Sequence, residues 1–184
     1  MDTQHRSPAR DISAYTLTEL MIGLALVGIL LSWGVPNFVG VFQRNLLSTQ
    51  TDLLVHHLFY ARTEAITRNL PVVICRSENA RNCTPSSSSK ADWSIGWLVF
   101  VNTDNDKTRD PDEPILRVGN AVPAPISVHF NQWWRIKFRP NGGAGNGSFT
   151  LCDGLGNNRR ITVYRSGRTR VTKINADEEF CPAS

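Results

Sequence analysis

Residues 15–35 read YTLTELMIGLALVGILLSWGV, and from Leu20 onward this stretch is almost wholly apolar. No charged residue occurs between Glu19 and Arg44. The uncharged run is therefore long enough to supply the roughly 20 helical residues that cross the hydrocarbon core of a bilayer. The chain contains one such run. We expect residues 15–35 to form a hydrophobic transmembrane helix, with the remaining residues on one side of the membrane.

The polar segment before this run, residues 1–14, differs from a secretory signal peptide. A secretory signal carries its cleavage site after the apolar region. Here the segment contains Arg6 and Arg10, and the small residue Ala14 precedes the apolar region. Cleavage after Ala14 would leave the apolar helix on the mature protein, so we expect residues 1–14 to be a leader peptide.

Residues 14–19, AYTLTE, resemble the prepilin signature of type IV pilins and type II secretion pseudopilins. In that signature a small residue, usually Gly, precedes an aromatic residue and a Thr-Leu-x-Glu stretch. The resemblance implies that a prepilin peptidase cleaves after Ala14 and that Tyr15 becomes the N-methylated first residue. It also implies an assembly role for Glu19, whose charge within an apolar segment is costly without a partner. That partner would be the N-terminal amine of a neighbouring subunit. The alternatives are a Glu19 that reaches the lipid headgroups and a simple membrane anchor.

The helical pattern continues after Pro36, because apolar residues recur at spacings of three and four from Phe38 to Ile66. We expect residues 36–70 to form the amphipathic second half of one long helix, which Asn69 and Pro71 end. We expect residues 71–184 to form a β-rich globular domain, since short Val, Ile, Thr and aromatic runs alternate with turn residues. The expected strands lie at 72–75, 95–101, 115–118, 126–130, 134–138, 148–152, 160–164 and 168–174. The predicted fold class is α+β, a long N-terminal helix packed on an antiparallel β-sheet.

Two further segments are similar to the GspH/FimT branch of the pilin superfamily. One is the helix end at 61–69, ARTEAITRN, and the other is 93–101, WSIGWLVFV, which precedes an Asn- and Asp-rich turn. The resemblance implies a type IV pilin-like fold and a minor pilin with other major and minor pilins as partners. It also implies a single-pass protein of the inner membrane with a periplasmic domain, which later becomes extracellular in the pilus.

Four cysteines in an exported domain indicate disulfides. The three ways of pairing them remain open, but Cys75 with Cys83 and Cys152 with Cys181 are favoured because each pair closes a local loop. A zinc site is the alternative, and the spacings lack the Cys-x-x-Cys element typical of one.

The segment from Asn102 to Glu113 places oxygen-bearing residues at the spacing of a calcium-binding loop, although Lys107 stands where such a loop needs Gly. A hairpin turn explains the same composition, so calcium binding stays open here. The chain contains no Gly-x-Ser-x-Gly or His-Glu-x-x-His motif. We therefore expect no enzymatic activity and no cofactor, and apart from the open calcium question we assign no metal ligands.

The formal net charge of +4 is concentrated near the C-terminus, where nine basic residues and one acid, Asp153, lie between Arg135 and Lys173. Within this region Ser166-Gly167 can turn the chain, and a following strand would point Arg168 and Arg170 to one face. Two guanidiniums on one face can each engage a phosphate. Arg165 and Lys173 would extend the contact.

The Gly-Arg-x-Arg element at 167–170 resembles the one that FimT-type minor pilins present to DNA in natural transformation. This resemblance implies a minor pilin that binds extracellular DNA through its phosphate backbone, independently of sequence. The alternatives are a structural minor pilin or pseudopilin that primes filament assembly, an adhesin for acidic polysaccharide, and a solvated edge strand. Both single-stranded and double-stranded DNA are compatible with these residues.

Overall fold

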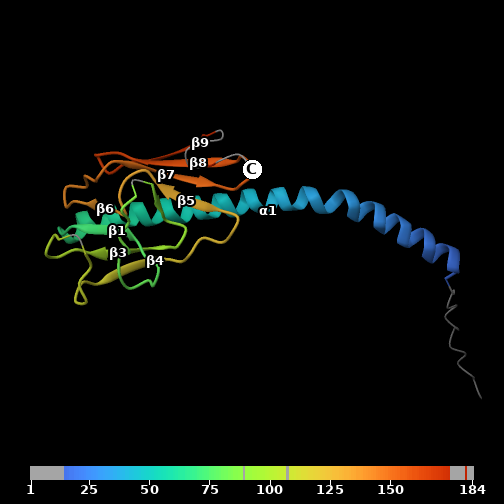
Figure 1. Ribbon diagram of the computed structural model, residues 1–184, viewed down its shortest axis with the longest axis horizontal. Coiled ribbons are helices and arrows are strands. Elements are labelled where there is room, and N and C mark those ends of the chain that lie inside the picture. Colours follow the sequence, from blue (N-terminus) through green and yellow to red (C-terminus); the bar gives the residue numbers. More distant parts are fainter. Residues whose placement is uncertain (1–14, 89, 107, 175–180, 182–184) are drawn as a thin grey trace, which may run out of the picture. The chain divides into compact units, whose positions relative to one another are not determined.

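The computed structural model describes residues 15–88, 90–106, 108–174 and 181, with the backbone alone at 33–38 (Figure 1). The predicted leader, including Ala14, lies outside the described residues. The chain divides at Val39 into two compact units. The β-strands and the core described below belong to the second unit, Gly40–Ser184.

Helix α1 spans Leu17–Arg68, and polar residues define both of its ends. At the start, the Glu19 N–H donates to the Thr16 hydroxyl (3.3 Å) and the Thr16 N–H donates to the Glu19 carboxylate (3.0 Å). This reciprocal pair is a capping box. At the other end Asn69 has a φ of 54°, a left-handed conformation that commonly terminates a helix before a proline such as Pro71. The predicted stop signals are confirmed.

The first part of α1 leaves its apolar side chains uncovered. Leu17 is 77% exposed, Met21 63% and Leu30 72%. Among the residues whose side chains are described, no helical stretch is both long enough and apolar enough to cross a membrane.

The described residues form nine strands, all paired antiparallel, in two sheets. The first sheet has the order β4-β3-β1-β6 and the second β2-β5-β7-β8-β9. The strands are β1 Val72–Arg76, β2 Ala91–Asp92, β3 Trp97–Val101, β4 Ile115–Gly119, β5 Ser127–Phe130, β6 Arg135–Phe138, β7 Gly147–Cys152, β8 Asn158–Val163 and β9 Thr169–Ile174.

The division into two sheets differs from the single sheet suggested by the sequence. Consecutive strands β5 and β6 do not pair: β6 pairs with β1, and β5 pairs with β7. The connection at 131–134 therefore carries the chain from one sheet to the other. The eight predicted strands are present, and the additional two-residue β2 was too short to show a pattern.

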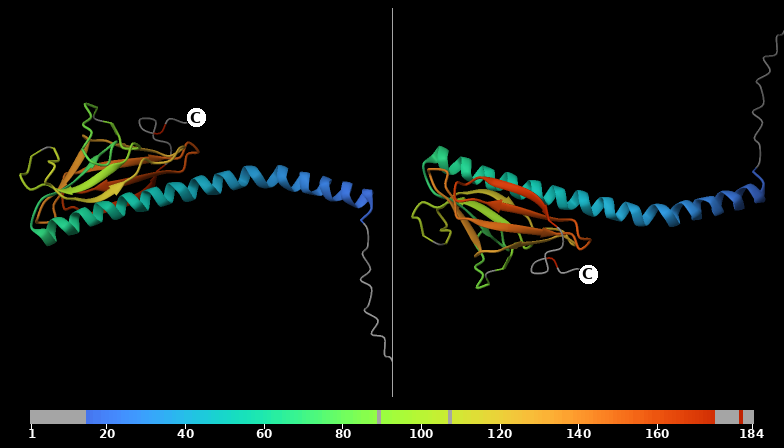
Figure 2. Two further views of the ribbon diagram at one scale, coloured as in Figure 1. Left: turned by 90° about the horizontal axis from the view of Figure 1, so that it is seen from below. Right: turned by 90° about the horizontal axis from the view of Figure 1, so that it is seen from above.

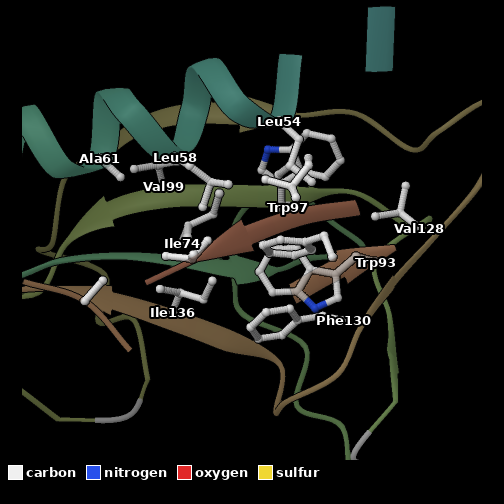
Figure 3. Close-up of a cluster of buried hydrophobic side chains, with 14 of the residues drawn as sticks. Leu54, Leu58, Ala61, Ile74, Trp93, Trp97, Val99, Val128, Phe130 and Ile136 are labelled. Atoms are coloured by element: carbon white, nitrogen blue, oxygen red, sulfur yellow. The ribbon is translucent and has the colours of Figure 1, made fainter. Parts of the chain in front are cut away.

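One hydrophobic core joins both sheets to the second half of α1, which runs alongside the strands in both views of Figure 2. Leu54, Leu58 and Ala61 of the helix are fully buried and meet Ile74, Val99 and Ile136 of the first sheet and Trp93, Val128 and Phe130 near the second (Figure 3). His57 is 5% exposed, and its Nδ1 accepts a hydrogen bond from Trp97 Nε1 (2.9 Å). Burial, His56 and Arg117 lower the pKa of His57.

The buried stripe of α1 is narrower than its apolar pattern suggested. Phe42 is 61% exposed and Ile66 49%, although both fit the spacing of the predicted stripe. Leu47, by contrast, is buried. The helix packs on the sheets along one line only, so apolar residues beside that line stay at the surface.

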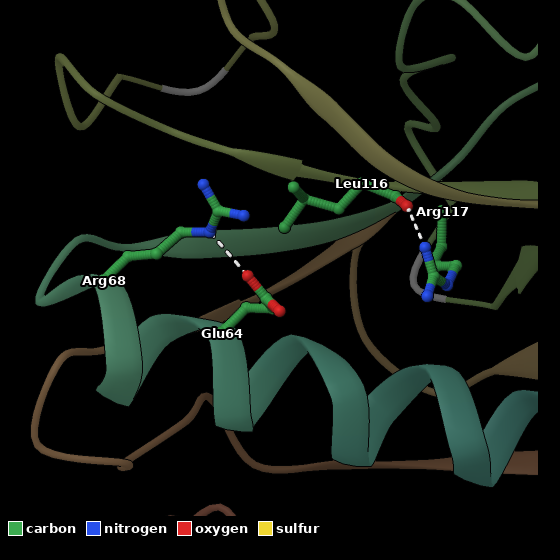
Figure 4. A network of polar contacts seen from close by, with 4 residues as sticks. All are labelled: Glu64, Arg68, Leu116 and Arg117. Atoms are coloured by element: carbon green, nitrogen blue, oxygen red, sulfur yellow. Dashed lines mark hydrogen bonds and ion pairs between the residues drawn. The ribbon is translucent and has the colours of Figure 1, made fainter.

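Helix α1 also contacts β4 through Tyr60. Figure 4 draws Leu116 and Arg117 of β4 together with Glu64 and Arg68 of the helix. The Arg117 guanidinium lies over the Tyr60 ring, 4.2 Å from its centroid. On the helix itself Arg68 pairs with Glu64, and this pair lowers the pKa of Glu64.

Both favoured cysteine pairings are present. Cys75 is bonded to Cys83 and Cys152 to Cys181, with Cα–Cα distances of 5.7 and 5.6 Å. The first bridge fastens the loop after β1 over the outer face of the first sheet, where Leu98, Phe100 and Trp134 form a second, smaller core.

Candidate nucleic-acid interface

The turn between β8 and β9 is closed by two backbone hydrogen bonds. The Gly167 N–H donates to the Tyr164 carbonyl (2.8 Å), and the Tyr164 N–H donates to the Arg168 carbonyl (2.9 Å). Gly167 has a φ of 73°, which side-chain-bearing residues rarely adopt. Glycine at 167 is therefore required by the backbone of the turn.

A second reason for glycine at 167 is close packing. A Cβ at this position would overlap the carbonyl oxygen of Gly142 and lie 2.9 Å from Arg62 Nε. The same Arg62 Nε donates to the Gly142 carbonyl (3.1 Å), and the Ala144 N–H donates to the Arg165 carbonyl (3.0 Å). Helix α1 and the 142–144 loop thus hold the turn in place. Gly167 is itself buried, so its role is to shape the site rather than to touch a ligand.

Arg168 and Arg170 are exposed at this supported turn. Strand β9 begins at Thr169, so Arg168 lies one residue before it. The two arginines line one shallow hollow of about 480 Å³ together with Tyr164, Ser166 and Thr169. No ion pair to either guanidinium occurs within the described residues. The hollow thus offers two cationic side chains and, in Tyr164, a ring that is 44% exposed.

Lys173 does not belong to this hollow. Across the β8–β9 pair Ile161 lies opposite Val171, and Arg159 lies opposite Lys173. Ile161 is fully buried in the core, so Val171 and Lys173 share its side of the sheet while Arg170 points to the other side. The predicted DNA-binding residues are therefore split: Arg165, Arg168 and Arg170 are exposed around the turn, and Lys173 lies on the opposite face of β9.

Two of the other basic residues face an acidic loop instead. Arg135 Nη1 donates to the Asp106 carbonyl (3.1 Å), and Lys137 Nζ donates to Asn105 Oδ1 (2.8 Å). Burial lowers the pKa of Arg135, and Asp106 opposes that change. The high charge of the C-terminal region is thus divided among separate surfaces.

The loop from Asn102 to Glu113 is held by the buried Glu113 carboxylate. Its two oxygens accept backbone N–H bonds from Thr103 (2.6 Å) and Asp110 (3.1 Å). In the calcium interpretation this carboxylate would be the bidentate ligand. Across the described part of the chain, no group of three or more His, Cys, Asp or Glu side chains is arranged to hold a metal ion.

Two further features of the sites have recognisable signals in the sequence, although they were not among the predictions. Thr16-Leu17-Thr18-Glu19 has the Thr-x-x-Glu spacing of a capping box, so Glu19 has a local structural role besides any role in assembly. Tyr164 immediately precedes the turn and lines the hollow. Arg62, in contrast, contacts the turn only through the tertiary fold.

Comparison with known protein families identifies the family to which the chain belongs. The family model described as type II transport protein GspH matches residues 50–167, more than half of the sequence. The chain belongs to the GspH family. The predicted relationship to the GspH/FimT branch is confirmed, and the protein is accordingly a minor pilin or pseudopilin of a type IV pilus or type II secretion system.

Solved structures show the same fold for this GspH-family chain. The type IV minor pilin FimU of Pseudomonas aeruginosa is 18% identical, and the match covers 70% of this chain and 90% of FimU with a TM-score of 0.52. The minor pseudopilin EpsH from the type II secretion system of Vibrio cholerae is 9% identical, with 72% and 98% covered and a TM-score of 0.50. The predicted α+β, pilin-like fold is confirmed. No curated protein matched in sequence.

Proposed function

We propose that this GspH-family protein is a minor pilin of a type IV pilus that binds extracellular DNA for uptake in natural transformation. The observation that carries the proposal is the joint exposure of Arg168 and Arg170 at one hollow beside Tyr164. The Gly167 turn presents both side chains from a rigid support, because it is fixed against Gly142 and Arg62.

Alternate residues of a strand lie about 7 Å apart, given roughly 3.4 Å per residue. Each guanidinium can form paired hydrogen bonds to a different phosphate, a geometry that lysine lacks. Contacts to phosphates carry no sequence information, so the protein accepts DNA of any sequence. Tyr164 adds a surface on which an unpaired base can stack.

The N-terminal segments have matching roles in the proposal. A prepilin peptidase removes residues 1–14, and Tyr15 becomes the N-methylated terminus. The uncovered apolar part of α1 lies in the inner membrane before assembly and among neighbouring pilins afterwards. Glu19 then meets the terminal amine of a neighbouring subunit, in place of its bond to Thr16. The globular domain is periplasmic at first and extracellular in the pilus.

A structural role is the second candidate, and the description of the matching family model as a type II transport protein favours it. In this case the protein primes assembly of a pilus or pseudopilus without binding DNA. The basic hollow would then contact a neighbouring subunit.

Replacement of the chromosomal allele in the source cells by Arg168→Gln/Arg170→Gln separates the two functions. DNA binding predicts that transformation falls at least tenfold while filaments and motility remain. The matched control Arg81→Gln/Arg117→Gln makes the same charge change at two other exposed arginines and should leave transformation unchanged. Loss of filaments in the first variant would instead support the structural role.

A further inference from the structure

A second basic cavity lies on the opposite face of β9 from the Arg168 hollow. It has a volume of about 400 Å³ and is lined by Arg44 and Leu47 of α1, residues 156–159, and Lys173 and Ile174 of β9. All of these residues belong to the compact unit that begins at Gly40. The cavity is therefore a feature of the globular domain with the helix segment packed on it.

The charges of this cavity are uncompensated within the described residues. Arg159 and Lys173 are direct cross-strand partners, and like charges placed opposite each other destabilise a sheet. None of the described residues that line the cavity carries a carboxylate. The neighbouring Asp153 is buried, and its carboxylate accepts hydrogen bonds from Leu155 and Asn157 instead. A bound anion would offset the repulsion that the fold imposes here.

The cavity combines this charge with an apolar wall. Leu47, which is buried, and Ile174, which is half-buried, both line the cavity, so it offers both cationic and apolar surface to one ligand. A small inorganic anion would use only the cationic part. A phosphate group attached to an apolar body would use both.

The position of Arg44 in the sequence indicates where such a ligand comes from. Arg44 is the first charged residue after Glu19 and lies nine residues beyond the end of the predicted transmembrane segment at Val35. Cationic residues next to an apolar helix attract anionic lipid headgroups. We propose that the cavity formed by Arg44, Arg159 and Lys173 binds the phosphate group of an anionic phospholipid while the protein resides in the membrane. This inference rests on the proposed membrane location of α1 and not on the proposed binding of DNA.

The test uses the full chain in a non-ionic detergent and isothermal titration calorimetry with three probes. These are dihexanoyl phosphatidylglycerol, dihexanoyl phosphatidylcholine and inorganic phosphate. We expect phosphatidylglycerol to bind at least tenfold more tightly than either of the others. Equal affinity for inorganic phosphate would overturn the lipid assignment, and equal affinity for phosphatidylcholine would overturn the role of net negative charge.

Two variants with the same charge change locate the site. Arg159→Gln/Lys173→Gln should weaken phosphatidylglycerol binding at least tenfold, whereas Arg168→Gln/Arg170→Gln should change it less than twofold. Arg44→Gln, on the exposed side of α1, provides a change that leaves the strands untouched and should also weaken binding. Equal losses in the two double variants would contradict the proposal. Binding that appears only after Asp177→Asn/Glu178→Gln/Glu179→Gln would also overturn it, because the chain's own acids would then be the natural occupant.

Discussion

Among single residues, His57 makes the stability of the core depend on pH. The imidazole is buried and accepts the Trp97 N–H through Nδ1, so the folded protein favours its neutral form. Burial, followed by His56 and Arg117, lowers the pKa of His57 below the value of about 6.5 that holds in the unfolded chain. At neutral pH both states carry a neutral imidazole and the stability is fully present. As the pH falls below about 6.5, the unfolded chain takes up the proton first and stability is lost.

We therefore expect the free energy of unfolding to fall as the pH is lowered from 7 to 5. In His57→Gln this fall should be smaller than in the wild type. Glutamine retains an acceptor for Trp97 and does not titrate. Urea unfolding at several pH values measures the effect, with His56→Gln as the exposed neighbouring control. If His57→Gln leaves the pH dependence as steep as His56→Gln does, buried His57 is not its source.

At the scale of elements, the β8–β9 turn depends on Gly167. Alanine at 167 would place a Cβ on a residue with a φ of 73° and against the Gly142 carbonyl. A side chain in the left-handed region costs about 1–2 kcal/mol, and the overlap adds to it. We expect Gly167→Ala to lower the free energy of unfolding by at least about 2 kcal/mol and to weaken DNA binding.

Gly145→Ala is the matched control, because a Cβ there meets nothing within 4 Å. Denaturant unfolding should show a change within about 0.5 kcal/mol for this variant. Equal destabilisation by both alanines would mean that the packing of the 167 turn has no special importance.

The strands and helix ends could be predicted because their signals are local, as in the Asn69 and Pro71 stop. The division into two sheets could not, because the pairing of β1 with β6 joins segments about 60 residues apart in the chain. Exposure of Phe42 and Ile66 was also beyond the sequence, since spacing identifies a helix face but not how much of it is covered. The placement of Lys173 and Arg170 on opposite faces of β9 could have been predicted from the sequence, because an odd spacing along a strand places two side chains on opposite faces.

In the molecule as a whole, the basic residues that the structure describes lie on separate surfaces, and each surface has a different role in this account. Arg135 and Lys137 fasten the acidic loop, Arg168 and Arg170 form the proposed DNA site, and Lys173 lines the proposed lipid site. A net charge of +4 therefore does not describe any one surface. The proposed binding of DNA depends on the placement of two arginines and not on the overall charge.

The salt dependence of DNA binding by the full chain tests this claim most directly. Fluorescence anisotropy with a labelled duplex between 20 and 200 mM salt gives the slope of log K against log salt, at roughly −0.9 per phosphate neutralised. We predict a slope of about −2 to −3 for the wild type. Its magnitude should fall by about 2 in Arg168→Gln/Arg170→Gln and should not change in Arg159→Gln/Lys173→Gln. Equal slopes and affinities for the wild type and the Arg168→Gln/Arg170→Gln variant would contradict the account.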